Sequence, residues 1–343
     1  PHGYRRGLDA AVKARATVTL PVQSQGFVFD PGKRYAGEVL VRDIGIGFDA
    51  GEERRPGTVQ WKRDLDRFLT RTPMGNKGTF GKVLVLAGSG AMCGAAVLCA
   101  RAVLASGAGM VKVVTEERNR TPLFCALPEA MADFWKEDEP LPEEALLQDL
   151  AWADAVVAGP GLSKSRTAKE LLVFTVQHTE VPLVLDADAL NLIAEDAEIL
   201  SGCRAEKILT PHVGELARLL HTTIAECQRE PAGSAGRAAE KYQACCVRKD
   251  SVTVTAEEGR EQYYINTSGS SALATAGSGD VLAGITGAFA AKRQCEKNEK
   301  KISLAKTAAL AAYAHGKAGE AAEEKSSASY VTASEIIRGL QSI

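Results

Sequence analysis

The sequence predicts an α/β fold with a mainly parallel central sheet. The prediction comes from short apolar runs rich in β-branched residues, each of which ends in a glycine-rich or polar turn that leads into a helical pattern. The clearest case is the strand Val83–Ala87, the turn Gly88–Gly90, an almost wholly apolar helix over 94–106 and a second strand over 111–114. Such a βαβ unit pairs its two strands in parallel.

The same pattern recurs three times downstream. Apolar strands at 155–158, 183–185 and 208–210 run into the turns Gly159–Leu162, Asp186–Asn191 and Pro211–Glu215. Helices are expected over about 167–178 and from Leu216 onward. Because the carboxyl ends of parallel strands line the ligand crevice of an open sheet, these turns should meet at one place.

The C-terminal third begins with a different pattern. Residues 246–255 and 262–266 bracket a charged turn at 257–260, which predicts an antiparallel hairpin. Buried helices are expected over 281–291 and 304–315, with a mixed-charge loop over 292–301 between them. Ser334 is a plausible N-cap for a last short helix.

The N-terminal segment does not resemble the start of a domain. Strands are expected at Ala16–Leu20 and Glu38–Ile44, with a turn at Asp30–Lys33 between them. Two strands without a helix to cover them cannot bury a core, so they should pack on the next domain or on a missing partner. The charged stretch 50–56 is typical of a linker, and a short amphipathic helix should follow it and end near Pro73.

Composition excludes several classes of protein. The 343 residues are 45% apolar and 24% charged, which is ordinary for a soluble globular protein. The net charge of −2 offers no electrostatic basis for binding nucleic acid or an anionic membrane. No apolar run reaches the ~20 residues that span a bilayer. The eight cysteines lack the spacing of metal sites or secreted disulfide frameworks, so we expect free thiols and a cytoplasmic location. The chain begins at Pro1, and we expect it to be a fragment or a processed product.

The stretch from Ala274 to Gly284 carries the most specific chemistry. Gly277 and Gly279 permit positive φ, and their amides at a helix N-terminus would attract an anion. Asp280 would repel that anion unless it faces a second molecule whose proton it removes. The sequence leaves two interpretations open: Asp280 is a general base beside a phosphate-binding turn, or it is a helix N-cap.

Other polar residues at strand ends also have two interpretations each. His212 could contact a ligand or move a proton, or it could be structural. Glu215 could be a first-turn acid or part of a metal–phosphate site. Asp186 and Asp188 could contact a metal or a ribose, although capping of the helix at Ala189 is favoured for Asp188, and Lys249 could neutralise phosphate or lie exposed on a strand.

Two common nucleotide motifs are absent. The glycine-rich turns do not fit G-x-G-x-x-G or G-x-x-x-x-G-K-[ST], so a Rossmann dehydrogenase and a P-loop ATPase are unsupported.

An ordered set of motifs between about residues 58 and 343 resembles the ADP-dependent NAD(P)H-hydrate dehydratase family. The motifs are KGTFG at 77–81, GS at 88–89, GAA at 94–96, GPGL at 159–162, DADALN at 186–191, TPHVGE at 210–215 and AGSGD at 276–280. The resemblance implies a ribokinase-like fold, a three-layer α/β/α sandwich with a mainly parallel central sheet.

The N-terminal segment resembles the closing part of an NAD(P)H-hydrate epimerase domain, which precedes the dehydratase in bifunctional repair enzymes. The matching residues are 11–14, 17–19, 31–32, 37–39 and 43–47. The expected organisation is therefore a short β-rich epimerase remnant at 1–48, a linker at 49–57 and the dehydratase domain at 58–343. Without the rest of the epimerase domain we expect no epimerase activity.

The resemblance implies a repair reaction on NADH or NADPH to which water has added. ADP, or ATP in some members, would phosphorylate the 6-hydroxyl of (S)-NADHX or (S)-NADPHX, and elimination of phosphate would regenerate NAD(P)H and leave AMP. Mg²⁺ would accompany the nucleotide. Family members are commonly tetramers or larger, so a homo-oligomer is expected.

The same resemblance assigns roles to residues. Asp280 would be the catalytic base. The substrate would contact Ala95, Gly161, His212 and Asp280. The adenine nucleotide would contact Lys249, Asp250, Ser251, Val252, Thr253, Gly277, Ser278 and Gly279.

Two positions depart from the family pattern. The usual Lys-Gly pair reads Lys249-Asp250, which adds a carboxylate beside the nucleotide, and the usual double glycine reads Ala276-Gly277. No cluster of ligands places the metal. Two alternatives are a small-molecule kinase on the same fold, such as a hydroxyethylthiazole or hydroxymethylpyrimidine kinase, and a nucleotide-binding remnant without catalytic activity.

Overall fold

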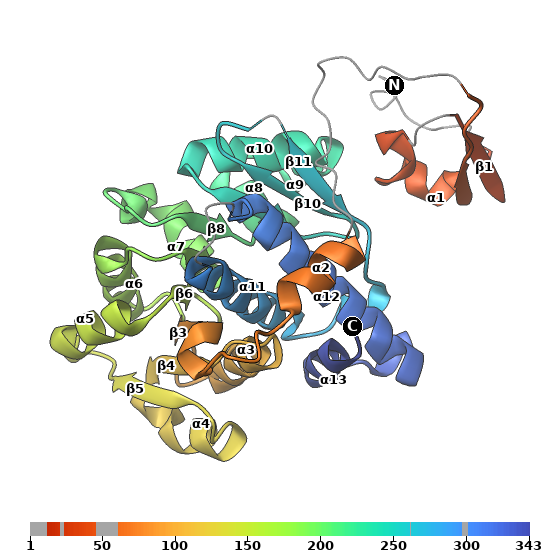
Figure 1. Ribbon diagram of the computed structural model, residues 1–343. Helices are drawn as coiled ribbons and strands as arrows, with labels where there is room; N and C mark the ends of the chain where they lie inside the picture. Colours follow the sequence, from red (N-terminus) through yellow and green to blue (C-terminus); the bar gives the residue numbers. More distant parts are fainter. Residues whose placement is uncertain (1–11, 21–23, 46–60, 261, 297–300) are drawn as a thin grey trace. The chain divides into compact units, whose positions relative to one another are not determined.

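The computed structural model describes residues 12–20, 24–45, 61–260, 262–296 and 301–343 (Figure 1). The chain divides into two compact units, Pro1–Arg55 and Pro56–Ile343. The expected linker at 49–57, residues 46–47 of the epimerase-like stretch and residues 297–300 of the mixed-charge loop lie outside the described residues.

The first unit contains a two-stranded parallel sheet. Strand β1 (Ala16–Thr19) pairs with β2 (Glu38–Val41) in register from Ala16 opposite Glu38. The expectation that no helix accompanies these strands is wrong, because the five-residue helix α1 (Gly32–Ala36) lies between them. A helical crossover is what a parallel pair requires.

The second unit is built on a nine-stranded sheet of order β11-β10-β9-β8-β7-β6-β3-β4-β5 (Figure 1). The strands are β3 (Lys82–Leu86), β4 (Met110–Glu116), β5 (Met131–Trp135), β6 (Ala155–Ala158), β7 (Leu183–Leu185), β8 (Lys207–Leu209), β9 (Cys245–Arg248), β10 (Thr253–Glu257) and β11 (Tyr263–Asn266). Every pair from β5 across to β9 is parallel, whereas β10 runs antiparallel to both β9 and β11.

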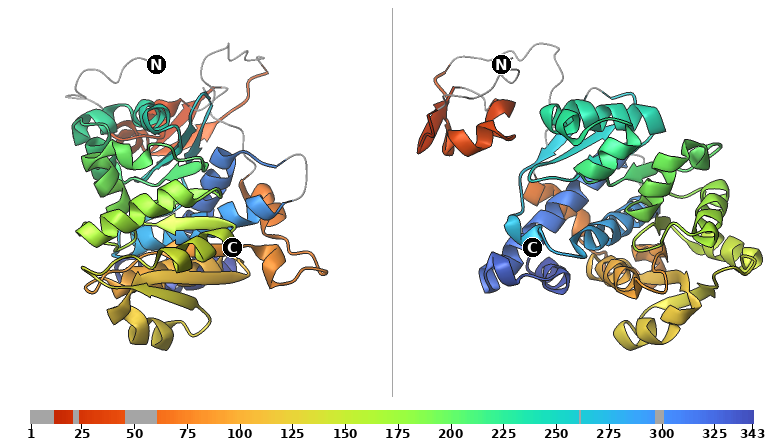
Figure 2. Two further views of the ribbon diagram at one scale, coloured as in Figure 1. Left: turned by 90° about the vertical axis from the view of Figure 1, so that its left-hand side faces the viewer. Right: turned by 180° about the vertical axis from the view of Figure 1, so that it is seen from behind.

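Helices cover both faces of this sheet, as the views in Figures 1 and 2 show. One buried apolar cluster joins the sheet to α2 (Trp61–Leu69), α3 (Cys93–Ala105), α4 (Arg120–Ala126), α11 (Ser278–Cys295), α12 (Leu304–Lys325) and α13 (Ala333–Gly339). The other joins the opposite face to α5 (Glu143–Trp152), α6 (Arg166–His178), α7 (Asp188–Glu195), α8 (Val213–Leu219) and α10 (Pro231–Tyr242). Helix α9 (Ile224–Arg229) precedes α10. The expected α/β fold with a mainly parallel sheet is confirmed.

Several predicted elements need correction. The stretch 246–255 is not continuous, because β9 ends at Arg248 and the antiparallel β10 begins at Thr253, so residues 249–252 form a turn. The last helix is capped at Thr332 and not at Ser334, and α8 starts at Val213, three residues before the expected position. Helix α4, the edge strand β5 and helix α5 were not predicted.

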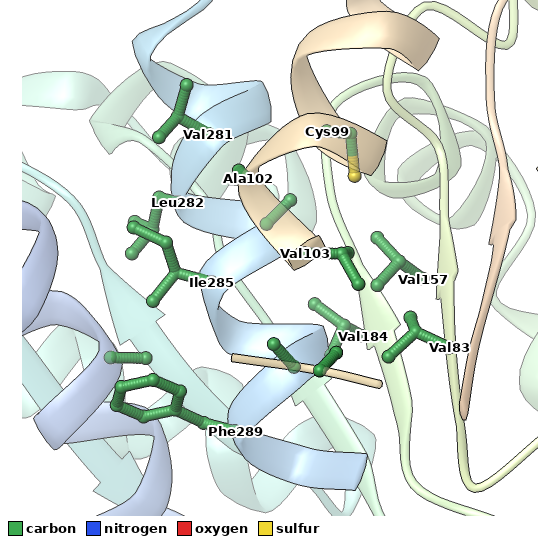
Figure 3. Packing of buried hydrophobic residues seen from close by; sticks show 14 of the residues in the cluster. Val83, Cys99, Ala102, Val103, Val157, Val184, Val281, Leu282, Ile285 and Phe289 are labelled. Carbon is green, nitrogen blue, oxygen red and sulfur yellow. The ribbon is translucent and has the colours of Figure 1, made fainter. Parts of the chain in front are cut away.

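Helix α11 packs unusually closely on its neighbours, and Figure 3 shows its side chains among those of α3 and the central strands. A Cβ atom built on Gly284 would lie 2.3 Å from the carbonyl oxygen of Cys99, and one on Gly287 would lie 2.3 Å from Cγ2 of Val157. Only glycine allows this approach. The N-terminus of α11, which carries Asp280, is thereby held against α3 and the sheet.

Candidate functional site

The polar turns that follow β3, β6, β7, β8 and β9 are joined by backbone hydrogen bonds. The amide of Gly88 donates to Pro160, that of Asp186 to Ala158, that of Thr210 to Leu185 and that of Lys249 to Pro211. Each bond links the end of one strand to the end of its neighbour. The prediction that these turns meet at one edge of the sheet is confirmed.

An ion pair occupies the centre of this edge. The Nζ atom of Lys249 lies 2.7 Å from Oδ1 of Asp186, and the Thr210 hydroxyl donates to the same oxygen at 2.8 Å. The side chain of Asp186 is only 2% exposed and that of Lys249 is 19% exposed. Lys249 is therefore not an exposed strand lysine. Burial lowers its pKa, but Asp186 and Glu215 more than offset this, so the pKa is raised and the side chain stays charged.

Asp280 stands beside this pair on the first turn of α11. The helix is capped by Gly277, which has a φ of 85° and makes no side-chain cap, so the N-cap interpretation of Asp280 is wrong. A Cβ atom on Gly279 would lie 3.5 Å from Nζ of Lys249 and 3.8 Å from Oδ2 of Asp186. The Gly277–Gly279 turn thus lies directly against the ion pair.

Burial and the charge of Asp186 raise the pKa of the Asp280 carboxyl to about 6, and Lys249 opposes them. A carboxylate with a pKa near 6 is ionised at neutral pH and accepts a proton more readily than an ordinary aspartate. This is the property that a general base at the site requires.

Ser278 of the same turn is buried and is held by a histidine from α12. Its Oγ atom lies 3.2 Å from Nε2 of His315. Burial and the charge of Lys249 lower the pKa of His315 to about 4, so the ring is neutral at neutral pH. The predictions did not include His315, because nothing in its helical pattern distinguishes it from an ordinary core residue.

His212 begins α8 as its N-cap. Its Nδ1 atom accepts hydrogen bonds from the amides of Gly214, at 3.0 Å, and Glu215, at 3.4 Å, while Oε2 of Glu215 accepts from the His212 amide at 2.8 Å. The ring is half exposed, and burial and the charges of Lys249 and Arg218 lower its pKa. The structure therefore supports the capping interpretation of His212, and its Nε2 atom lies 3.3 Å from Oε1 of Glu215.

Glu215 is buried beneath His212. Burial is the main cause that raises the pKa of its carboxyl to about 7, partly opposed by Lys249. Because one oxygen accepts from the His212 amide, Glu215 completes a capping box.

Asp188 does not cap its helix. The N-cap of α7 is Ala187, which has a φ of 48° and makes no side-chain cap. Oδ2 of Asp188 instead accepts from the amide of Ser163 at 2.9 Å, which ties α7 to the turn after β6.

Gly161 and Ala95 lie against each other. Gly161 has a φ of 58°, and a Cβ atom built on it would lie 2.8 Å from Cβ of Ala95 and 2.9 Å from Cβ of Met92. The turn after β6 therefore touches the start of α3. This contact brings together two residues that the resemblance assigns to the substrate.

The remaining predicted residues form the turn between β9 and β10. Lys249 is the cationic member of the ion pair with Asp186. Ser251 is exposed, Val252 is buried and Thr253 begins β10. Asp250 pairs with Arg248, since Nη2 of Arg248 lies 3.0 Å from Oδ2 of Asp250. Arg248 was not among the predicted site residues.

A second group that was not predicted shapes the turn after β3. The buried Glu116 accepts a hydrogen bond from the amide of Gly90, and Nδ2 of Asn119 donates to the carbonyl of Ser89 at 3.1 Å. Glu116 is the last residue of β4 and Asn119 follows that strand, so the end of one strand orders the turn after its neighbour.

A cavity of about 740 Å³ opens beside the site. Its lining includes Lys164, Asn191, Gly214 and Arg218, and Nε of Arg218 donates to Oδ1 of Asn191 at 3.1 Å. Lys164 lies three residues beyond Gly161, and Gly214 two residues beyond His212. The cavity is therefore adjacent to both of these residues.

Within the described ranges, no group of three or more His, Cys, Asp and Glu side chains is placed to hold a metal ion. A Mg²⁺ ion bound mainly by nucleotide phosphates needs only one or two protein carboxylates. Asp186 fits this limited role, because Lys249 and Thr210 bind Oδ1 whereas Oδ2 lies toward Gly279. None of the described helices has both the length and the hydropathy of a membrane span.

Comparisons with known sequences point to one family. The family model described as NAD(P)H-hydrate dehydratase matches residues 83–342. A bifunctional NAD(P)H-hydrate repair enzyme of Moorella thermoacetica is 35% identical over 330 residues, which cover 92% of this chain and 59% of that enzyme. An ADP-dependent (S)-NAD(P)H-hydrate dehydratase of Neisseria meningitidis is 36% identical over 281 residues, which cover 80% of this chain and 88% of that enzyme. The chain spans 59% to 61% of the length of three bifunctional relatives.

Solved structures agree with these sequences. A ribokinase-like superfamily protein of Enterococcus faecalis is similar with a TM-score of 0.70 and 27% identity, covering 84% of this chain and 97% of that one. An ADP/ATP-dependent NAD(P)H-hydrate dehydratase of Bacillus subtilis, co-crystallised with ATP/Mg²⁺, is similar with a TM-score of 0.67 and 29% identity, covering 81% and 95%. The predicted ribokinase-like fold is confirmed.

Proposed function

Because the chain belongs to the NAD(P)H-hydrate dehydratase family, we propose that it catalyses the ADP-dependent dehydration of (S)-NAD(P)H hydrate back to NAD(P)H. The observation that carries this proposal is the half-buried Asp280, with a pKa of about 6, between a glycine turn at a helix N-terminus and the Lys249–Asp186 ion pair. That arrangement places a base for a hydroxyl proton next to groups that attract phosphate.

In the proposed reaction, Asp280 removes the proton of the 6-hydroxyl while that oxygen attacks the β-phosphorus of ADP. The new O–P bond replaces the bond to AMP, and the phosphate then leaves from C6 as the C5 proton is lost. The amides of Gly277 to Gly279 and the charge of Lys249 stabilise the phosphoryl group during transfer. Mg²⁺ bound with the nucleotide would neutralise phosphate charge, and Asp186 would hold it.

We assign the nucleotide to the turn of Lys249, Asp250, Ser251, Val252 and Thr253, together with Gly277, Ser278 and Gly279. The convergence of the two segments on Lys249 supports the assignment, since Nζ lies near Gly279 while its own turn follows β9. His315 would keep Ser278 in place.

We assign the nicotinamide end of the substrate to Ala95, Gly161 and His212, opposite Asp280. The cavity beside Gly214 would receive the diphosphate and adenosine of the same substrate, because the cationic Arg218 lines it. Lys164 also lines the cavity, but it is paired with Glu195 at 2.7 Å. This assignment applies to (S)-NADHX and (S)-NADPHX alike.

We also propose that residues 1–48 are the closing part of an epimerase-like domain and that the chain works in the cytoplasm.

We further propose that the chain forms a homo-oligomer. The edge strand β5 supports self-association, because Met131 on it and Phe124 on α4 are both more than a third exposed. Light scattering coupled to gel filtration would test the oligomeric state.

The direct test is incubation of the protein with NADHX, ADP and Mg²⁺ while the absorbance of reduced nicotinamide is followed. We expect recovery of NADH with one AMP and one phosphate per turnover. A stable phosphorylated product would instead identify a small-molecule kinase, and ADP binding without any product would identify a remnant that only binds nucleotides.

A further inference from the structure

Two residues at the start of the proposed nucleotide turn form an ion pair in which only the arginine is buried. Arg248 ends β9, and its side chain is 2% exposed; that of Asp250, two residues later, is 35% exposed. Nη2 of Arg248 donates to Oδ2 of Asp250 at 3.0 Å, while Oδ1 accepts from the amide of Ser251 at 2.8 Å. Both oxygens of the carboxylate are therefore engaged.

The pair and Lys249 belong to opposite faces of the sheet. Alternate residues of a strand point to opposite faces, and Cys245 and Val247 pack in the cluster that contains α11. Arg248 therefore points away from α11, toward α9. Burial raises the pKa of the Cys227 thiol on α9, and the charge of Arg248 is among those that lower it. The Asp250 carboxylate is drawn toward this second face, away from Asp280.

Arg248 and Asp250 depend on each other. Nε of Arg248 has no hydrogen-bond partner, so Asp250 supplies the ion pair that compensates its buried charge. Conversely, without Arg248 the Asp250 carboxylate would be an unpaired negative charge in the turn assigned to a nucleotide. This carboxylate would repel the phosphates of the nucleotide, because like charges repel and water screens them less beside a protein.

We propose that Arg248 is a positioning residue for nucleotide binding: it holds and neutralises Asp250, so that the turn accepts a polyanion. The ligand class is a nucleoside diphosphate. This proposal rests on the assignment of ADP to residues 249–253.

The experiment is a double-mutant cycle on the whole chain, with Arg248→Leu, Asp250→Gly and the double variant. Calorimetry measures ADP binding with Mg²⁺ and no hydrate, and thermal denaturation measures stability. Arg229→Leu is the matched control, because it removes an exposed arginine from α9.

We expect Arg248→Leu to weaken ADP binding about tenfold, raising KM for ADP with little change in kcat, because only the free carboxylate repels the ligand. Asp250→Gly should lose stability, because Arg248 becomes an unpaired buried charge. The double variant should recover both properties, and Arg229→Leu should change neither.

Two results would overturn the proposal. One is unchanged ADP affinity in Arg248→Leu; the other is a double variant that binds ADP as weakly as Arg248→Leu does. If Arg248→Leu does not fold, Arg248→Gln provides the same comparison, because it removes the charge and keeps a polar side chain. Asp250→Gly/Arg248→Gln must then bind ADP more tightly than Arg248→Gln does. A protein that binds ADP but does not recover NADH would contradict the proposed reaction and leave the role of Arg248 intact.

Discussion

The Nζ atom of Lys249 lies 2.7 Å from Oδ1 of Asp186, although 63 positions separate the two residues in the sequence. Lys249 follows β9 and Asp186 follows β7, with β8 between them in the sheet. The pair sits beneath the glycine turn that precedes Asp280. The charge state of Asp280 therefore depends on both residues, in opposite directions.

This relationship predicts how activity should vary with pH. Asp280 acts as a base only when ionised, so turnover should fall as the pH drops through about 6. Asp186→Asn removes a negative neighbour, which should lower the Asp280 pKa and move this acid limb to lower pH. Lys249→Gln removes a positive neighbour and should move the limb upward. Profiles of kcat against pH at saturating ADP would measure both shifts, and shifts of the same sign would contradict the argument.

Asp280→Asn should abolish proton abstraction, because asparagine has the size and shape of aspartate but lacks a basic carboxylate. We expect kcat to fall by about 10²–10⁴-fold, the usual contribution of a general base. Binding of the hydrate and of ADP, measured by calorimetry, should stay close to that of the unaltered protein. A near-normal rate would mean that Asp280 has only a structural role in the first turn of α11.

Gly161→Ala should damage the substrate side of the site selectively. The added methyl group would meet Cβ of Ala95 at 2.8 Å in a backbone with a φ of 58°, and the left-handed conformation alone costs about 1–2 kcal/mol. We expect a higher KM for the hydrate, lower stability to denaturant and unchanged ADP affinity. Gly236→Ala is the control, because its methyl group would have no neighbour within 4 Å and should not reduce stability. Equal behaviour of the two variants would refute the packing argument.

Two substitutions distinguish the helix-capping role of His212 from its proposed contact with the hydrate. Asparagine also caps helices well, so His212→Asn should keep the stability of the protein, whereas His212→Ala should lose about 1 kcal/mol. If the imidazole contacts the hydrate, both variants should raise KM for it by similar factors. Normal hydrate kinetics in His212→Asn would reduce His212 to a capping residue.

Arg218→Gln tests the cavity beside the site. Removal of one cation should raise KM for the hydrate about tenfold, since hydrogen bonds to a charged group are stronger than neutral ones. The ADP affinity measured by calorimetry should not change, because the nucleotide is assigned to residues 249–253 and 277–279, none of which lines this cavity. Arg229→Gln on α9 is the control, and an effect of equal size there would indicate a general loss of surface charge.

Much of the site follows from local sequence. The strands that precede Gly88, Gly159, Asp186 and Thr210 are recognisable because each is a short buried run that ends in a turn. Gly277 and Asp280 are recognisable because a glycine turn with positive φ and an acid in the first turn of a helix both depend on a few consecutive residues. That these turns meet at one edge then follows from the rule that parallel strands present their carboxyl ends together. The order of the strands in the sheet does not follow from that rule.

Other features depend on partners that are distant in sequence. Along the edge strand β5 the residues run from exposed Met131 to buried Trp135 without regular alternation, so this stretch lacks the pattern that marks a central strand. The turn at 249–252 separates two runs rich in apolar and β-branched residues, 245–247 and 252–255, so the sequence predicts one continuous strand there.

The sequence by itself determined the fold class, the set of turns and the position of Asp280 beside a glycine turn. Periodicity and backbone freedom, on which these depend, are properties of short segments. Only the tertiary structure decided that Asp186 holds Lys249, that His315 holds Ser278 and that Arg248 holds Asp250. These are electrostatic and hydrogen-bonded pairings, and their strength depends on burial. Burial is settled only when α11, α12 and the sheet have packed together, so no local pattern records it.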